Sequence, residues 1–478
     1  MAKTMQTEME NEAYADLTPI QRFFFGRSVF ITGATGFVGK LFTKLKEIYP
    51  NFQKHVRLVD GDLLKERLGI SEENFEEMKA TVSVVFHSAA RVQFNDPIKK
   101  AVQHNIIGTK VFLAMCNEMP NLEAVVHVST AFVRKEADNH VYEKIPQTKV
   151  TPKQILDAME WMDSDCQKAV EDYLLEKKFT TYLVTKALGE VVVSEECRDT
   201  PTSIIRPGNI SPTFKDPFPG WCDSIQGLSG LILAGAKGVL RALMSVAELK
   251  LNIVPVDLVV NSMIVSAWHI AKERPPSVYI VNCVMDYYKL PMADETILQK
   301  ALEKRKDYPL VNMFRYPDFK IYYSWVPYKI HSIIDEWIPA YICDFFLYIF
   351  TGQTVLVRVH KKIKFIYDIF LRLGRDPWIC CLDNFNTMKD SLKNGDEEIF
   401  FLDTEDFDWD SYMEDCFLGG RKFIAHEDPS NIPYARKKAQ IWWFVTTVLK
   451  WFLIMLFIYY VFPRSLFGSD DRMHDVHS

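Results

Sequence analysis

Six short apolar runs, separated by helical stretches, constrain the fold of this chain more than any other feature. The runs have the length of buried strands and are rich in Val and Ile. They lie at residues 28–31, 56–59, 82–86, 124–128, 203–205 and 278–283. Helical patterns fill the intervals, as at residues 97–115 and 181–197. Because strands that alternate with helices build a parallel sheet covered on both faces, we expect an α/β domain with a doubly wound parallel sheet.

Composition and charge exclude several classes of protein. The 478 residues are 48% hydrophobic and 25% charged, which is globular composition and excludes a disordered or collagen-like chain. The net charge of -6 argues against a nucleic-acid binder, which would carry a concentrated basic field. The nine cysteines are an odd number with no repeated spacing, so we expect reduced thiols facing the cytosol rather than a disulfide framework.

The C-terminal end predicts a membrane anchor, whereas residues 1–21 are polar and lack the apolar core of a signal peptide. Residues 441–462 hold one charge, Lys450, and as a helix would span about 33 Å against a bilayer core of about 30 Å. Their apolar side chains favour insertion by roughly 4 to 8 kcal/mol, against about 3 kcal/mol for Lys450. A buried or surface-lying helix is the alternative, because Lys450 is near the middle. The basic residues 436–438 favour a cytosolic N-terminal side.

A glycine-rich loop follows the first predicted strand and opens a helix. Its residues include Gly33, Thr35, Gly36, Phe37 and Gly39. The first glycine allows a tight turn, the second lets a pyrophosphate approach the backbone, and the third permits close packing of helix on strand. The positive end of the helix then faces the phosphates. The loop predicts a Rossmann-type dinucleotide site.

Four side chains further along the chain suit carbonyl reduction beside a nicotinamide. Tyr182 and Lys186 are four residues apart in a predicted helix and therefore lie on one face. A Lys beside a phenol favours the phenolate, so we expect Lys186 to lower the pKa of Tyr182. Ser129 and Thr130 end a predicted strand, where hydroxyls point into the crevice at the carboxyl edge of the sheet. A hydroxyl would orient the carbonyl oxygen, Tyr182 would protonate it, and Lys186 would hold the ribose and tune the phenol.

Taken together, these motifs resemble an extended short-chain dehydrogenase/reductase and, more closely, the animal fatty acyl-CoA reductases. The resemblance covers almost the whole chain. In the reductase part it rests on residues 25–33, 85–90, 127–132, 182–190, 206–207, 219–221 and 254–257. In the C-terminal part it rests on Asp408-Trp409, Tyr412, Gly420-Arg421-Lys422 and residues 427–431, which resemble the helical domain peculiar to that family.

The resemblance implies a reaction and a role for each residue. Tyr182 and Lys186 would be the catalytic pair, with Thr130 as hydroxyl partner and Ser129 as the less favoured candidate. The three glycines would carry the pyrophosphate of NADPH. Asp62 would contact the adenine. Long-chain acyl-CoA would be reduced twice by hydride, first to a hemithioacetal that collapses to aldehyde and CoA, then to the primary alcohol.

One segment departs from the family. The family has a longer stretch before Gly61-Asp62, with a second strand and a basic residue that binds the 2'-phosphate of NADPH. Here only 22 residues separate Gly39 from Asp62, as in a deletion or alternative splice product. Spacing alone would make residues 56–59 the second strand and Asp60 the ribose-binding acid. The family match instead makes this run the third strand, in a sheet that lacks one early strand. Arg57 and Lys54 are weak candidates to replace the basic residue that binds the 2'-phosphate.

These observations divide the chain and leave three hypotheses. The predicted parts are an N-terminal arm (1–27), a reductase domain (28–288), a connecting apolar helical region (289–354), a helical domain (355–438), a transmembrane helix (441–462) and a polar tail (463–478). Within them, residues 337–350 are apolar but short, and predict a buried or membrane-surface helix. The leading hypothesis is a membrane-anchored, NADPH-dependent acyl-CoA reductase, in the endoplasmic reticulum or alternatively the peroxisome. The others are a catalytically impaired, regulatory family member and a membrane-bound sterol-type dehydrogenase.

Overall fold

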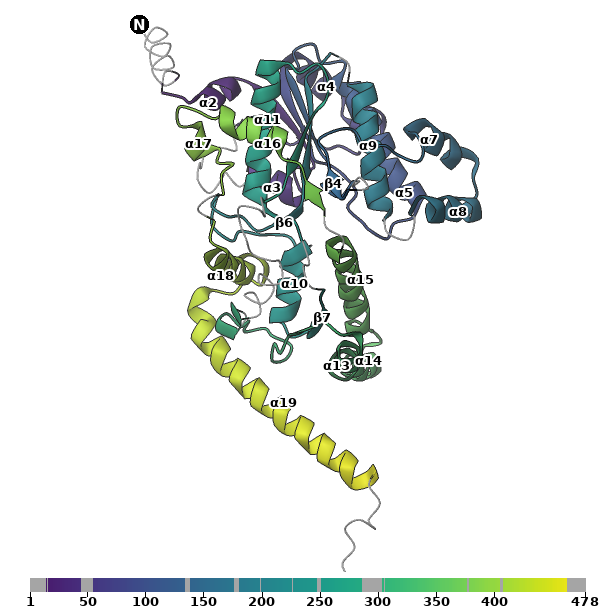
Figure 1. Cartoon of the computed structure of the whole chain (residues 1–478), viewed down its shortest axis with the longest axis vertical. Helices are drawn as coiled ribbons and strands as arrows, with labels where there is room; N and C mark the ends of the chain where they lie inside the picture. The colour runs from purple at the N-terminus through teal and green to yellow at the C-terminus, as the bar shows by residue number, and fades with distance from the viewer. Residues whose placement is uncertain are drawn as a thin grey trace, which may run out of the picture.

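The computed structural model (Figure 1) describes most of the chain. The described residues are 14, 16–43, 55–133, 138–175, 180–197, 199–225, 227–246, 251–285, 303–304, 306–375, 378–404 and 407–461. Lys54, the expected polar tail and half of the expected N-terminal arm lie outside them.

A five-stranded parallel sheet forms the upper half of the molecule in Figure 1. Its order is β1 (Ser28–Thr32), β2 (Val82–His87), β3 (Ala124–Val128), β5 (Thr202–Pro207) and β9 (Tyr279–Cys283). Each neighbouring pair is parallel. The predicted α/β class and five of the six predicted strands are confirmed. Strands of a parallel sheet that is covered on both faces are typically continuous apolar runs like these.

The prediction of a strand at residues 56–59 is wrong. Residues 56–60 are irregular and mostly exposed, and the Leu58 side chain is 85% exposed. A β-strand is defined by backbone hydrogen bonds to a neighbouring strand, and no described backbone hydrogen bond joins residues 56–60 to β1. Within the described residues β1 is therefore an edge strand, with Ser28 and Val29 exposed, whereas all six residues of β2 are buried. The usual dinucleotide-binding order places two further strands beyond the first one, so the described sheet lacks two, not one.

Helices cover both faces of the sheet. On one face lie α11 (Val256–Glu273), α3 (Phe37–Thr43) and α16 (Asp383–Ser391), and on the other lie α9 (Thr181–Glu196), α6 (Gly108–Cys116) and α4 (Glu72–Thr81) (Figure 1). Alternate strand residues serve the two cores: Val84 and Phe86 pack in the core that includes α11, and Val85 packs in the core of α6 and α9. A helix with a π-turn precedes α6, formed by α5 (Ile98–Val102) and η4 (Gln103–Ile107). Two helices, α7 (Pro152–Trp161) and α8 (Ser164–Leu175), lie outside α9.

The lower half is mainly helical. It contains α10 (Gly227–Ala236), α13 (Trp325–Ser332), η5 (Ile333–Trp337), α14 (Ile338–Thr351), α15 (Leu356–Arg375), α18 (Trp409–Gly419) and the π-turn η6 (Gly420–Ile424). Residues 337–350, expected to be buried or to lie on a membrane surface, fall in η5 and α14 and are not buried: Asp344 is the one buried residue of α14.

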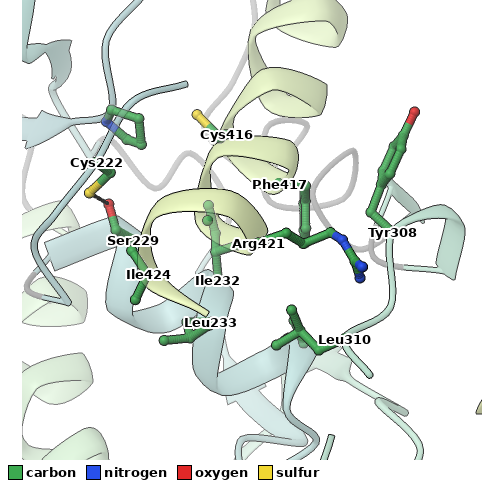
Figure 2. Close-up of a pocket in the computed structure, with 13 residues that line it drawn as sticks. Cys222, Ser229, Ile232, Leu233, Tyr308, Leu310, Cys416, Phe417, Arg421 and Ile424 are labelled. Atoms are coloured by element: carbon green, nitrogen blue, oxygen red, sulfur yellow. Dashed lines mark hydrogen bonds between the residues drawn. The ribbon is translucent and has the colours of Figure 1, made fainter. Parts of the chain in front are cut away.

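Figure 2 shows where α18 and η6 pack on α10. Cys222 and Ser229 point toward each other, with 3.2 Å between Sγ and Oγ. Arg421 is buried, and its guanidinium pairs with Glu427 at 3.3 Å. The remaining space is about 20 Å³, no more than a water molecule needs. This junction lies within the lower half and is too small for a substrate.

The last described helix, α19 (Ile432–Val461), extends away from the rest of the chain (Figure 1). Within Pro429–Tyr460, an 18-residue apolar stretch has a mean hydropathy of 2.0 and is not buried in the protein. Among the described residues it is the one helix long and apolar enough to cross a membrane. It is a candidate membrane-spanning helix, at the position the sequence predicts.

Candidate active site

The glycine-rich loop turns sharply between β1 and α3. Gly33 has a φ of +72°, and its carbonyl oxygen accepts a 2.8 Å hydrogen bond from the Gly36 N–H. A Cβ on Gly33 would lie 2.8 Å from the backbone nitrogen of Ala89, in the segment after β2. A Cβ on Gly39 would overlap the Gly33 carbonyl and lie 2.6 Å from the Cα of Ala34. Only glycine fits at these two positions, and the loop keeps the shape that suits a pyrophosphate at a helix N-terminus.

The carboxyl end of β3 presents the two predicted hydroxyl residues. Ser129 and Thr130 follow directly after Val128, and both are buried. Thr130 Oγ1 accepts a 3.4 Å hydrogen bond from the Phe132 N–H, so its own proton stays available for donation. Ser129 Oγ is buried and has no hydrogen-bond partner among the described residues. Buried hydroxyls in this state are uncommon and call for a ligand or water.

Tyr182 and Lys186 lie in the first half of α9, as the sequence predicts. Lys186 Nζ donates a 2.7 Å hydrogen bond to the carbonyl oxygen of Val128. Burial lowers the pKa of Lys186 to about 8, while Glu190 acts to raise it. The Tyr182 ring packs edge-to-face on Phe94, with centroids 5.5 Å apart.

The expected lowering of the Tyr182 pKa is not found. Burial raises the pKa of this phenol instead. The reason is that Tyr182 is 9% exposed and its charged form is penalised by desolvation. Tyr182 therefore keeps its proton at neutral pH, which suits a proton donor.

A buried ion pair that the sequence interpretation missed fixes the position of α9. Arg206 Nη2 lies 2.5 Å from Glu190 Oε2, with side chains 1% and 0% exposed. The same guanidinium donates to the carbonyl oxygens of Tyr142 and Lys144, at 2.8 Å each. Glu190 is four residues after Lys186, so Tyr182, Lys186 and Glu190 lie on one face of the helix. This spacing was the sequence signal that could have indicated a role for Glu190.

Asn105, in the π-turn η4, was also missed. Its Nδ2 donates a 3.0 Å hydrogen bond to Thr185 Oγ1 in α9, and its Oδ1 accepts one of 2.9 Å from the Arg91 N–H. Asn105 thus links α9 to the segment after β2. No spacing rule marks a π-turn, so the sequence carries no signal for it.

Two buried histidines, His87 at the end of β2 and His127 in β3, have ring centroids 5.1 Å apart. Burial lowers the pKa of His87 to about 3 and that of His127 well below its usual value, and the charge on Lys186 adds to both effects. Both rings are neutral at physiological pH. They provide no charge for the chemistry.

One cleft of about 870 Å³ brings all ten predicted site residues together. Its lining includes Gly33, Thr35, Gly36, Phe37, Gly39, Asp62, Ser129, Thr130, Tyr182 and Lys186. An apolar part of the lining comes from Ile369, Phe370 and Leu373 of α15. The cleft therefore places a dinucleotide loop, two hydroxyls, a phenol and an amine against an apolar wall.

Basic side chains near the cleft are largely engaged. Lys40 pairs with Asp223 at 2.6 Å, and Arg91 pairs with Asp96. Arg57, a weak candidate for the phosphate clamp, is turned to Glu77 and does not line the cleft. Asp62 does line it, and its Oδ1 accepts a 3.0 Å hydrogen bond from the Leu64 N–H.

Comparison with known proteins identifies the family of the chain. An NAD-binding family model described as "Male sterility protein" matches residues 41–263, and a model named Sterile, with the same description, matches residues 335–427. The chain is 30% identical to fatty acyl-CoA reductase 1 of Homo sapiens over 468 residues, 88% of this chain and 89% of the relative. The chain belongs to the fatty acyl-CoA reductase family. Fatty acyl-CoA reductase 2 of Mus musculus is 29% identical over 466 residues, with the same shares covered.

Membership of the fatty acyl-CoA reductase family makes the chain a relative of oxidoreductases whose first domain takes a nicotinamide cofactor. The first model match begins at residue 41 and therefore does not include the glycine-rich loop at residues 33–39. Among solved structures, the terminal R domain from the myxalamid PKS-NRPS biosynthetic pathway has 17% identity and a TM-score of 0.47, over 84% of this chain and 91% of that chain.

Proposed function

We propose that this chain reduces long-chain fatty acyl-CoA to the primary alcohol with NADPH. The observation that carries the proposal is the single cleft that unites the glycine loop, Thr130, Tyr182 and Lys186. The family relationship supplies the acyl-CoA substrate. The division into a reductase domain over residues 28–288 and a helical domain over 355–438 belongs to the same proposal.

The residues present fit a nicotinamide dinucleotide. Gly33 and Gly39 leave a cradle that a Cβ would fill, and Asp62 lies in the same cleft for the adenine. When bound, NADPH supplies one hydride for each of the two reductions. The choice of NADPH over NADH rests on the family, because Lys40 and Arg91, which line the cleft, are paired with carboxylates.

Each reduction places negative charge on the carbonyl oxygen of the substrate. Thr130 donates a hydrogen bond to this oxygen, with Ser129 as the second candidate. Tyr182 then delivers its proton to the oxygen. Lys186 is four residues away on the same helix face and stabilises the phenolate that remains. The same groups serve both reductions, since the same oxygen is charged in each.

The acyl chain follows the apolar wall of the cleft. Ile369, Phe370 and Leu373 are the side chains of α15 at this wall, and an alkyl chain loses water-exposed apolar surface by packing on them. Long chains therefore gain more than short ones. Selectivity among substrates at this wall therefore depends on the length of the acyl chain and not on the CoA moiety.

We place the protein in a membrane through α19, with the catalytic half on the cytosolic side. The basic residues Arg436, Lys437 and Lys438 near its start support this orientation. The endoplasmic reticulum is our first expectation and the peroxisome the alternative. Alkaline carbonate extraction of the full chain tests the anchor. We expect the protein to stay in the membrane pellet, and its release into the supernatant would refute the anchor.

The second candidate function is that of a catalytically impaired family member. The edge position of β1 favours it, since the first strand usually lies inside the sheet. An isotope experiment separates the two. With NADPH deuterated at the transferred position, an active reductase yields alcohol carrying deuterium twice at C1, and an impaired member yields none.

A further inference from the structure

The helix formed by α13, η5 and α14 presents a large apolar face outward. It runs without a break from residue 325 to 351 and ends at Gly352, whose φ of +70° turns the chain into α15. In Figure 1, α13 and α14 lie at the foot of α15. The exposed side chains of α14 are Ile338, Tyr341, Ile342, Phe345, Phe346, Tyr348, Ile349, Phe350 and the terminal Thr351.

The acidic side chains of the same helix point the opposite way. Asp344 is 3% exposed, and its carboxylate accepts hydrogen bonds from the backbone N–H groups that begin α15, the shortest being 2.8 Å from Leu356. Glu336 is 1% exposed and pairs with Lys364 at 2.9 Å. A helix on a water-exposed surface has the reverse pattern, with charges outward. The outer surroundings of α14 are therefore apolar.

The charges that reach the surface beside this face are mostly basic, with the exposed Asp368 of α15 as an acidic exception. Across described residues 325–365 the exposed charged side chains are Lys329, Arg358, Lys361 and Lys362. Asp335, the one partly exposed acid there, is held by His331 at 2.8 Å. A basic rim around an apolar face with Tyr and Trp side chains matches the headgroup layer of an anionic bilayer.

The position of the face relative to α19 points to the same occupant. Figure 1 shows α13 and α14 end-on, and α19 lengthwise, at the same lower end of the molecule. Hence α14 runs crosswise to the candidate membrane-spanning helix. A helix crosswise to one that spans a bilayer runs parallel to the bilayer plane.

We infer that α13, η5 and α14 form a second membrane-binding element that lies in the interfacial layer of the bilayer that α19 crosses. The α15 helix then connects this element to the cleft: it begins beside the basic rim, and its Ile369, Phe370 and Leu373 line the cleft wall. In a step that rests on the proposed function, α15 guides acyl chains from the membrane to the active site.

Lipid photolabelling of the full chain tests this inference. The chain is reconstituted in vesicles of phosphatidylcholine and phosphatidylserine that contain a phospholipid with a diazirine about 5–10 Å below the headgroup, the depth of interfacial helices. Adducts are mapped by mass spectrometry. We expect adducts on residues 338–350 as well as on α19, and none on Trp161 and Tyr173, which are 72% and 59% exposed on α7 and α8.

A triple variant, Phe345→Gln, Phe346→Gln and Phe350→Gln, sharpens the result. Because these side chains are exposed, their replacement leaves the fold intact, and we expect adducts on α14 to be lost while those on α19 remain. Adducts on α19 with none on residues 338–350 of the wild-type chain would overturn the inference and point to a protein partner. The readout does not use activity, so failure of the proposed function would leave it unaffected.

Discussion

Lys186 Nζ donates a 2.7 Å hydrogen bond to the carbonyl oxygen of Val128, the last residue of β3. Val128 is followed by Ser129 and Thr130, and Lys186 follows Tyr182 by one helical turn. This one bond therefore ties the helix that carries the phenol and the amine to the strand end that carries the hydroxyls. The groups that would act on a carbonyl are held as one unit in the described chain.

The buried ion pair between Glu190 and Arg206 should be essential for this unit. Replacing Glu190→Gln leaves the Arg206 charge buried without a counter-charge, which costs about 3–5 kcal/mol. Glu196→Gln in the same helix is the matched control, since Glu196 pairs with Lys110 at 3.0 Å on the surface. Such exposed pairs contribute less than about 1 kcal/mol. Thermal unfolding in detergent should show a large drop in midpoint for the first variant only, and equal midpoints would contradict the assignment.

The close packing around Gly39 in the glycine-rich loop predicts that one added methyl group weakens cofactor binding. In Gly39→Ala the new Cβ overlaps the Gly33 carbonyl, and the strain of about 1–3 kcal/mol opens the loop. We expect weaker NADPH binding, measured by nicotinamide fluorescence titration. Gly420→Ala is the control, because its φ is -58° and the added Cβ meets no atom within 4 Å. Unchanged binding in Gly39→Ala would rule out this loop as the pyrophosphate site.

The pKa of Lys186 predicts how the reaction rate depends on pH. Its pKa is lowered to about 8 by burial, so it is charged below that pH and neutral above it. Because the charge stabilises the phenolate of Tyr182, the rate should fall as pH rises through about 8. Lys186→Arg keeps its charge at all these pH values, so this alkaline decline should disappear. The exposed Lys168→Arg should leave the profile unchanged, and a decline that survives in Lys186→Arg would assign it to another group.

The two hydroxyls at the end of β3 can be ranked by substitution. Thr130→Val keeps the shape but removes the donor to the substrate oxygen, and loss of such a donor typically lowers kcat by about 10²–10³-fold. Ser129→Ala removes a hydroxyl that is buried away from solvent, so we expect a smaller loss. Rates of purified full-length variants at saturating substrate decide the order. A larger loss in Ser129→Ala would reverse the two roles.

Much of the sheet and of the cleft could be predicted because local pattern and tertiary burial agree there. The run at residues 124–128 is β3 to the residue, and residues 181–197 differ from α9 by one. The glycine loop was found from its position between a predicted strand and a helix, and Tyr182 and Lys186 from their four-residue spacing and their order in the chain. Asp62 was placed by the family resemblance, and it lines the same cleft.

The remaining features depend on partners that local sequence does not reveal. Residues 56–59 have the composition of a strand, but without a ladder partner Leu58 is 85% exposed in irregular chain. The orientation of α14 was open because Asp344 and Glu336 find buried partners only after the chain has turned into α15. The pKa of Tyr182 was mispredicted because burial penalises the charged form of the phenol and raises its pKa.

The most direct test of the account is product analysis in membranes of cells that express the full chain. Membranes are incubated with NADPH and long-chain acyl-CoAs, and fatty alcohol and aldehyde are measured by mass spectrometry. Tyr182→Phe is the variant expected to be inactive. Tyr173→Phe, which removes an exposed hydroxyl, is its matched control. The account predicts fatty alcohol from the wild type and Tyr173→Phe, and none from Tyr182→Phe. Absence of both products from well-expressed, folded wild-type protein would contradict it.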